Sequence, residues 1–243
     1  MEKPIKFKNI LAGGCSFSQN GIGGEPPTLT SAGANSFRYD IDYGKAEPVS
    51  WTSFLAYSMN PDSFTNVAVS GQGLTTTSKT ICDMLDRFNY QPSDTLVIFN
   101  ISKLSRLDIQ CNFTDGTRFV PWTHDILDYS FLQPHTTEWK KHFVDTTLEK
   151  TQEQSLDSLS RLFKYLKYNK YPFVFTLLDN ITDISLIQKY KSHLVPLKQH
   201  GIYEYCRSIN AISEDHFHPT TQGYHAVGKF AHNFIQQKYK LGT

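Results

Sequence analysis

Residues 10–18 read ILAGGCSFS, so an apolar run passes into two glycines and then into Cys15 and Ser16. A short apolar run bounded by glycine is typical of a buried strand, and glycines allow a sharp turn directly after it. In open α/β sheets, ligands bind at the carboxyl ends of the strands. The segment therefore predicts a strand that presents the Ser16 hydroxyl to a crevice, although by itself the pattern equally fits a plain turn. No Gly-Lys-Ser/Thr follows, which disfavours a phosphate-binding loop.

Similar apolar runs recur along the chain and alternate with helical patterns. The predicted buried strands are Lys6–Gly13, Phe64–Val69, Thr95–Asn100 and Pro172–Leu178. Apolar residues at helical spacing predict the helices Trp51–Met59, Thr75–Phe88, Thr146–Tyr168 and Thr221–Tyr239. Continuous apolarity indicates strands buried on both faces. We therefore expect a three-layer α/β/α sandwich with a mainly parallel central sheet of about five strands.

The length of 243 residues suits one domain that spans the whole chain, 1–243. Two stretches do not follow the strand–helix alternation and are expected to be long loop insertions, at about 18–50 and 103–145. The second contains many aromatic residues, Phe119, Trp122, Tyr129, Phe131 and Trp139. Loops of this length are uncommon in compact domains unless they are functional or carry structure of their own.

The charge balance gives no sign of a polyanionic partner. Lys and Arg number 24 and Asp and Glu 23, for a net charge of +1, so neither nucleic acid nor an anionic membrane is expected as a partner. No run reaches the ~20 apolar residues of a membrane span, and the apolar stretch near the N-terminus is too short for a signal peptide. We therefore expect a protein that is made in the cytosol. Release of the protein by cell lysis, as for a phage protein, would leave no mark in the sequence.

Cysteine and histidine spacing indicates neither a metal site nor a redox site. The four cysteines, Cys15, Cys82, Cys111 and Cys206, form no C-x-x-C pair. The nine histidines show no H-E-x-x-H spacing. No metal and no cofactor are expected.

A second candidate motif is DHFHP at 215–219, just before the last predicted helix. Asp215 and His218 stand three residues apart, a spacing that lets a carboxylate accept a hydrogen bond from an imidazole and stabilise its protonated form. His216 is a rival base. Pro219 suits the first turn of a helix, so a helix cap with two incidental histidines is the alternative interpretation.

Two more polar groups follow predicted strands, in NVAVSGQG at 66–73 and LVIFNIS at 96–102. The N–H of Gly71 and the side-chain amide of Asn100 are suitable donors for an oxyanion. Taken singly, a simple glycine turn at Gly71 and a loop cap at Asn100 are the favoured interpretations.

The order Ser, Gly, Asn and Asp-x-x-His at successive strand ends resembles the SGNH hydrolase superfamily, also called GDSL esterases, which has a flavodoxin-like fold. In this resemblance Ser16 corresponds to the nucleophile and Gly71 to the glycine of the second block. Asn66 matches the asparagine that often precedes that glycine, and Asp215 and His218 match the last block.

The chain departs from the family pattern in two places. Cys15 stands where the family usually has Asp, and Ile98–Ile101 replaces the usual G-x-N-D. The stretch NISKLSR also resembles phage-type members, in which a polar residue is followed by an arginine. Arg106 is then a candidate site or structural residue.

The resemblance implies a serine esterase in which Ser16, His218 and Asp215 form a triad and an acyl-enzyme intermediate. The implied oxyanion hole comprises the N–H groups of Ser16 and Gly71 with the Asn100 amide, and Ser102 competes for the last role. The implied substrate is a small-molecule or carbohydrate ester with an acetyl or other short acyl group.

Three alternatives remain open at this point. Cys15 is a conceivable nucleophile, because thiolates attack well. A second alternative is that the domain has the same fold but no catalytic activity and binds a glycan. A third is an acyltransferase that passes the acyl group to a sugar hydroxyl. The sequence does not determine the oligomeric state.

Overall fold

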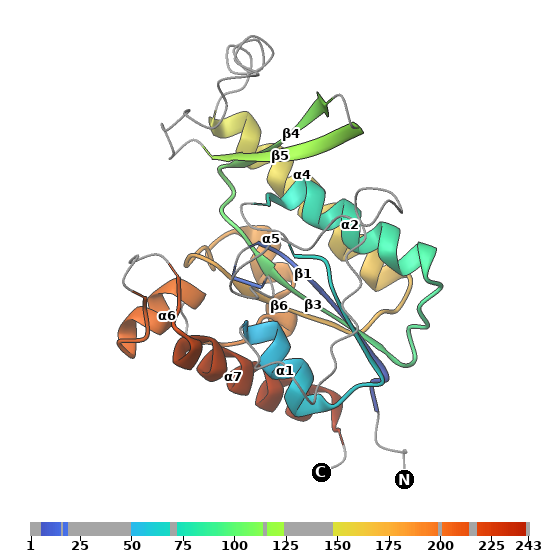
Figure 1. The fold of residues 1–243 in the computed structure, drawn as a ribbon, viewed down its shortest axis with the longest axis vertical. Helices are drawn as coiled ribbons and strands as arrows, with labels where there is room; N and C mark the ends of the chain where they lie inside the picture. Colours follow the sequence, from blue (N-terminus) through green and yellow to red (C-terminus); the bar gives the residue numbers. More distant parts are fainter. Residues whose placement is uncertain are drawn as a thin grey trace.

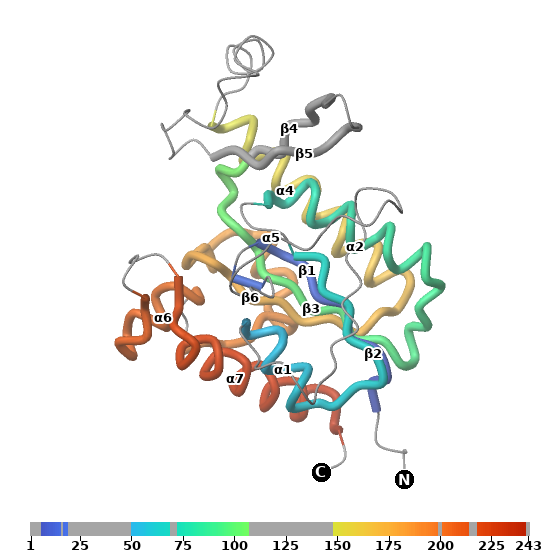
Figure 2. The backbone as a smooth tube through the Cα atoms, in the orientation of Figure 1, coloured from blue at the N-terminus to red at the C-terminus, as the bar shows by residue number. Residues whose placement is uncertain are grey.

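A computed structural model describes residues 6–15, 17–18, 50–68, 72–113, 116–123, 148–198, 201–213 and 218–241, with side chains omitted from 107 to 123. Its centre is a parallel sheet in the strand order β2-β1-β3-β6. The strands are β1 (Asn9–Gly13), β2 (Ser63–Asn66), β3 (Thr95–Ile101) and β6 (Phe173–Leu177). The backbone trace places β2 beside β1 at one edge (Figure 2).

All four predicted strands are present, each within a few residues of its expected bounds. The expected fifth strand is reduced, within the described residues, to a single parallel bridge between Phe175 and Leu194 beyond β6. β3 is buried along its whole length, as expected for a central strand covered on both faces.

Helices cover both faces of the sheet, so the predicted three-layer architecture is confirmed (Figure 1). One face carries α1 (Trp51–Met59), α6 (Ile202–Ser208) and α7 (Thr221–Tyr239). The other carries α2 (Leu74–Arg87), α4 (Leu148–Tyr168) and α5 (Ser185–Lys189). A 3₁₀ turn, η2 (Lys191–His193), follows α5.

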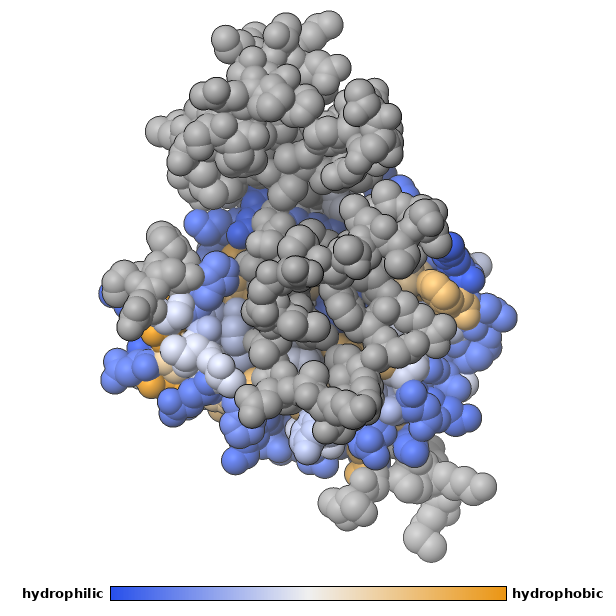
Figure 3. Space-filling view, viewed as in Figure 1, coloured by the Kyte–Doolittle hydropathy of each residue, from blue (hydrophilic) through white to orange (hydrophobic). Residues whose placement is uncertain are grey.

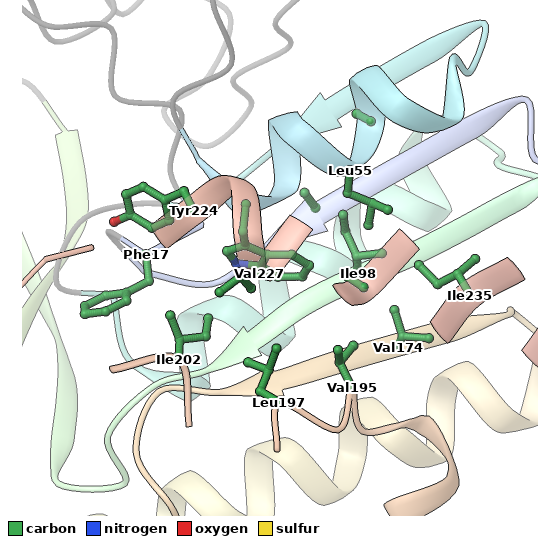
Figure 4. Packing of buried hydrophobic residues seen from close by; sticks show 14 of the residues in the cluster. Phe17, Leu55, Ile98, Val174, Val195, Leu197, Ile202, Tyr224, Val227 and Ile235 are labelled. Atoms are coloured by element: carbon green, nitrogen blue, oxygen red, sulfur yellow. The ribbon is translucent and has the colours of Figure 1, made fainter. Parts of the chain in front are cut away.

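The sequence of β3 shows how one strand serves two cores. Leu96 and Ile98 belong to the cluster on the α1 and α7 face, whereas Val97, Phe99 and Ile101 belong to the cluster on the α2 and α4 face. This alternation follows from the two-residue repeat of a strand. Figure 4 shows Ile98 with Val227 and Ile235 of α7 in the first of these clusters.

An antiparallel hairpin, β4 (Arg106–Phe113) and β5 (Gly116–Thr123), follows β3. It lies within the stretch 103–145 that was expected to be a loop, so that expectation is corrected for these residues. Apolar and polar residues alternate from Leu107 to Phe113, the pattern of a half-buried strand, which the analysis of continuous apolar runs did not detect.

Polar caps determine where the helices that border the site begin. Ser50 and Ser53 form a reciprocal capping box at the start of α1. The Thr220 hydroxyl accepts the N–H of Gly223 at the start of α7. The predicted bounds of α1 and α7 agree with the structure.

No helix among the described residues is long and apolar enough to cross a bilayer. The coloured surface visible in Figure 3 is mainly hydrophilic.

Candidate active site

Cys15, Asn100 and Ser102 lie at or just beyond the carboxyl ends of β1 and β3. β1 and β3 are paired in parallel up to Gly13 and Phe99, so the segments that follow them emerge side by side. Cys15, Asn100, Ser102, Arg106 and His218 lie within the described residues. Ser16, Gly71 and Asp215, and the rival base His216, lie outside them.

Asn100 connects β3 to the chain on both sides of residue 16. Its Oδ1 accepts the Cys15 N–H at 3.0 Å and the Ser18 hydroxyl at 2.7 Å. Its Nδ2 donates to Cys15 Sγ at 3.3 Å, and the side chain is 0% exposed. The Ser18 N–H also donates to the Cys15 carbonyl at 2.9 Å. These bonds give Asn100 a structural role that the sequence did not indicate.

Gly14 allows this close approach. Its φ of +131° is a backbone conformation that side chains other than hydrogen rarely permit. A Cβ at this position would lie 1.9 Å from Asn100 Oδ1. Residue 14 of the predicted turn must therefore be glycine for two reasons, the backbone conformation and the nearby Asn100 side chain.

Ser18 is the centre of a second group of buried hydrogen bonds. Its hydroxyl accepts the indole N–H of Trp51 at 2.9 Å. Its carbonyl accepts from Asn66 Nδ2 at 2.7 Å and from the Thr52 hydroxyl at 2.9 Å. Asn66 Oδ1 in turn accepts the Ala68 N–H at 3.0 Å. The turn after β1 is thus attached to the start of α1 and to the end of β2.

Single-sequence reasoning identified Asn66 through the family resemblance but missed Ser18, Trp51 and Thr52. The contacts that define their roles span 14 to 48 positions of the chain. No local pattern marks such residues. The available signal was the placement of polar Ser18 two positions beyond the predicted nucleophile.

His218 lies beside the residue that follows Ser16. The rings of His218 and Phe17 have centroids 5.3 Å apart and an interplanar angle of 36°. The His218 carbonyl accepts both the N–H and the hydroxyl of Ser213 at 2.8 Å. Pro219 forms an antiparallel bridge with Ile212. The structure therefore brings His218 to the turn after β1, about 200 positions away in the sequence.

Ser102 directly follows β3 and is 1% exposed. Its hydroxyl finds no hydrogen-bond partner among the described residues. An unpaired buried hydroxyl costs about 1–3 kcal/mol, and such groups often serve a catalytic role or hold a water or ligand.

Arg106 begins β4, and its backbone fixes the path from β3 to the hairpin. Its N–H donates to the Lys103 carbonyl at 3.2 Å, and its carbonyl accepts from the Ser155 hydroxyl of α4 at 3.5 Å. One guanidinium nitrogen, Nη1, is buried with no partner among the described residues.

Two other described cysteines are poor nucleophiles. Burial raises the pKa of Cys206 to about 12. Burial, with the nearby carboxylates of Asp86 and Asp83, raises the pKa of Cys82 to about 12. Both thiols therefore stay protonated near neutral pH. Within the described part of the chain, no group of three or more His, Cys, Asp or Glu is arranged to hold a metal ion.

No protein-family model matches the sequence, and no curated protein matches it. Several solved structures are similar to the chain at low sequence identity, and they include a lipolytic G-D-S-L protein and two esterases. A member of the lipolytic G-D-S-L family from Veillonella parvula is 11% identical with a TM-score of 0.45, over 96% of this chain and 98% of that one.

Two further similar structures are esterases. The psychrotrophic esterase EstA from Pseudoalteromonas sp. is 10% identical with a TM-score of 0.47, over 95% of this chain and 97% of that one. An acetyl xylan esterase from Geobacillus stearothermophilus is 9% identical with a TM-score of 0.47, over 98% of this chain and 97% of that one.

Proposed function

We propose that the protein is a serine esterase of the SGNH (GDSL-like) superfamily, with Ser16 as nucleophile, His218 as general base and Asp215 as the residue that orients His218. The observation that carries the proposal is the contact of the His218 ring with Phe17, the residue next to Ser16. Nucleophilic catalysis needs a base close to the serine, and the contact supports this assignment because Phe17 directly follows Ser16 in the sequence, after a strand whose carboxyl end is where ligands bind in such sheets.

The reaction proceeds in two stages. The Ser16 oxygen attacks the ester carbonyl carbon while His218 takes the hydroxyl proton. The tetrahedral intermediate collapses when His218 gives that proton to the departing alcohol, which leaves an acyl-enzyme. A water molecule then attacks the acyl carbon while His218 accepts its proton. The second tetrahedral intermediate collapses as the bond from the acyl carbon to the Ser16 oxygen breaks and His218 returns the proton to that oxygen, which releases the acid and regenerates Ser16. Asp215 stabilises the imidazolium that forms in each stage.

The oxyanion that forms in both stages needs donors. The N–H groups of Ser16 and Gly71 supply two of them, together with a side chain at the end of β3, for which Asn100 and Ser102 are the candidates. Each such donor typically contributes about 10²–10³-fold to turnover.

We further propose that the substrate is an acetyl or other short acyl ester carried on a carbohydrate. The support is compositional: the segment 103–145 contains five Phe, Tyr and Trp residues between 119 and 139, and aromatic side chains provide large apolar contact surfaces. A panel of acetyl, butyryl and longer aryl esters, followed by acetylated oligosaccharides, measures the acyl and carrier preferences.

The decisive experiment compares the unaltered protein with Ser16→Ala on acetyl and butyryl aryl esters. Loss of nearly all hydrolysis in Ser16→Ala is expected, because triad members act as a unit. A Ser16→Ala protein that retains the original rate would remove the assignment.

Two companion measurements identify the other groups. His218→Ala should abolish hydrolysis, whereas His216→Ala should retain most of it. Inactivation by a serine-directed phosphonate, without inactivation by a thiol alkylating agent, would identify Ser16 and not Cys15 as the nucleophile. Product analysis with an added sugar acceptor detects acyl transfer in place of hydrolysis.

A further inference from the structure

We infer that the Ser102 hydroxyl, and not the Asn100 amide, is the side-chain donor to the oxyanion, and that Asn100 is a positioning residue for the turn that carries Ser16. This inference rests on the proposed esterase function and specifies which group at the end of β3 touches the reacting atoms.

The side chain of Asn100 is already hydrogen-bonded to residues of the turn after β1. Its Oδ1 accepts from Cys15 and Ser18, and its Nδ2 donates to the Cys15 sulfur. The three bonds fix the amide plane toward the two residues that bracket Ser16. Asn100 Oδ1 also lies 1.9 Å from where a Cβ of residue 14 would be. An amide held in this way orients the turn, and these bonds use both acceptor sites of Oδ1 and one of the two Nδ2–H donors.

The Ser102 hydroxyl is buried and finds no partner among the described residues. It also lies further along the chain toward the carboxyl end of β3, where ligands bind in open α/β sheets. Phe99 pairs with Gly13, the last residue of β1, so Ser102 follows the strand that lies next to the one leading into residue 16. We infer that a hydroxyl at this place donates to the anion that forms on a substrate attached to Ser16.

Side-chain alternation directs Ser102 to the correct side of the sheet. Ile98 packs in the cluster on the α1 and α7 face, which also contains Phe17 and Cys15. Asn100 and Ser102 follow Ile98 at two-residue steps, so they share that face. His218 contacts Phe17 on the same face.

Thr176 provides a matched control. Its hydroxyl is also buried and without a partner among the described residues, with 0% of the residue exposed. It lies on β6, in register with Asn100, and β3 separates it from β1. Loss of this hydroxyl should leave hydrolysis unchanged, because it is one strand further from the nucleophile turn.

The experiment compares Ser102→Ala, Ser102→Thr and Thr176→Val on an acetyl aryl ester. We expect Ser102→Ala to lower kcat about 10²–10³-fold with little change in KM. Ser102→Thr, which keeps a hydroxyl, should recover at least about a tenth of the original kcat. Thr176→Val should remain within about 2-fold of it.

A thionoester probe separates donation to the oxyanion from a structural effect. Its carbonyl sulfur is a weaker hydrogen-bond acceptor than the oxygen of the ordinary ester. The ratio of ester to thionoester kcat/KM should fall in Ser102→Ala and stay unchanged in Asn100→Ala. Asn100→Ala should instead lower the melting temperature, because it leaves the Cys15 N–H and Ser18 hydroxyl unpaired.

The outcomes are distinguishable. If Ser102→Ala retains kcat within about 2-fold while Ser16→Ala is inactive, the inference fails and the esterase proposal stands. If the ester to thionoester ratio falls in Asn100→Ala and not in Ser102→Ala, Asn100 is the donor. Full activity of Ser16→Ala would remove the proposed function itself.

Discussion

The ring of His218 lies against the ring of Phe17, with centroids 5.3 Å apart. Phe17 is 5% exposed and belongs to the core cluster on the α1 and α7 face. The imidazole therefore has an apolar neighbour that is itself fixed by the core. This contact restricts the ring to one side of the turn after β1 and is the basis of the first prediction.

Phe17→Leu should lower kcat about 3- to 10-fold, because an aromatic pair contributes about 0.5–1.5 kcal/mol beyond area burial. The measurement is kcat and melting temperature on the same preparation. The matched control is Phe54→Leu, because Phe54 makes a similar ring contact with a histidine outside the predicted triad, His225, with centroids 5.0 Å apart. Equal losses of kcat in the two variants would show that the Phe17 contact has no special part in hydrolysis.

Ser18→Ala should destabilise the fold and reduce hydrolysis together. The substitution leaves the Trp51 indole N–H without its acceptor and Asn100 Oδ1 without one of its two donors. Buried unpaired groups cost about 1–3 kcal/mol each. Urea unfolding and kcat are the measurements.

The control for that substitution is Ser78→Ala in α2. The Ser78 hydroxyl is buried with no partner among the described residues, so its removal should be neutral or stabilising. A loss of stability in Ser78→Ala as large as that in Ser18→Ala would contradict the hydrogen-bond explanation.

Gly14→Ala should be far more damaging than Gly13→Ala. At residue 14 the new Cβ meets Asn100 Oδ1 at 1.9 Å, and the φ of +131° adds backbone strain. At residue 13 the nearest atoms, at 2.7 and 2.9 Å, belong to the Ile81 side chain, which can shift. We expect a loss of more than about 2 kcal/mol for Gly14→Ala, with little or no hydrolysis, as judged by urea unfolding and assay. Similar losses in the two variants would rule out the special role of the Gly14–Asn100 contact.

Stability should fall as the pH is lowered from 7 toward 5, in part because of His193. Burial lowers the pKa of His193 below 6.5, and the nearby Lys238 and Lys167 act in the same direction, against the raising effect of its bond to the Phe173 carbonyl. A histidine with a depressed pKa binds fewer protons when folded, so its contribution is present above the unfolded pKa and is lost below it. Burial also lowers the pKa of His232.

Melting temperatures measured at several pH values test this prediction, with His193→Gln as the variant. The imidazole stacks on Phe173 with centroids 4.0 Å apart, so the variant should be less stable at pH 7. Its melting temperature should nevertheless depend less on pH between 7 and 5 than that of the unaltered protein. An unchanged dependence on pH would exclude His193 as a contributor.

The layered fold could be predicted because each buried strand is a continuous apolar run and each long helix has an apolar face. The limits of α1 and α7 were predictable because Ser50 and Thr220 cap them locally. The β4–β5 hairpin was missed because its signal is alternation and not continuous apolarity. The short α6 was also missed, since seven residues provide too little periodicity.

The site was predictable only in part. Family-like motifs located His218 and Asn100, but the contacts of Asn100 with Cys15 and Ser18 arise from strand pairing across more than 80 positions. The role of Trp51 as a donor to Ser18 depends likewise on how α1 packs. Such roles follow from tertiary structure, which local sequence patterns do not encode. The catalytic assignments of Ser16, Gly71, Asn100, Asp215 and His218 stay predictions.

The bonds from Asn100 to Cys15 and to Ser18 span 85 and 82 positions of the chain, respectively. This separation determines when the turn after β1 can become ordered during folding. While the chain is being synthesised, the segment around residue 16 emerges long before its anchor does. Loop closure over such a distance is slow compared with local helix formation. The bonds that hold the turn after β1 therefore form late on the folding route, after β3 has joined β1, and a shortened chain that ends before β3 would lack the Asn100 side chain that anchors this turn.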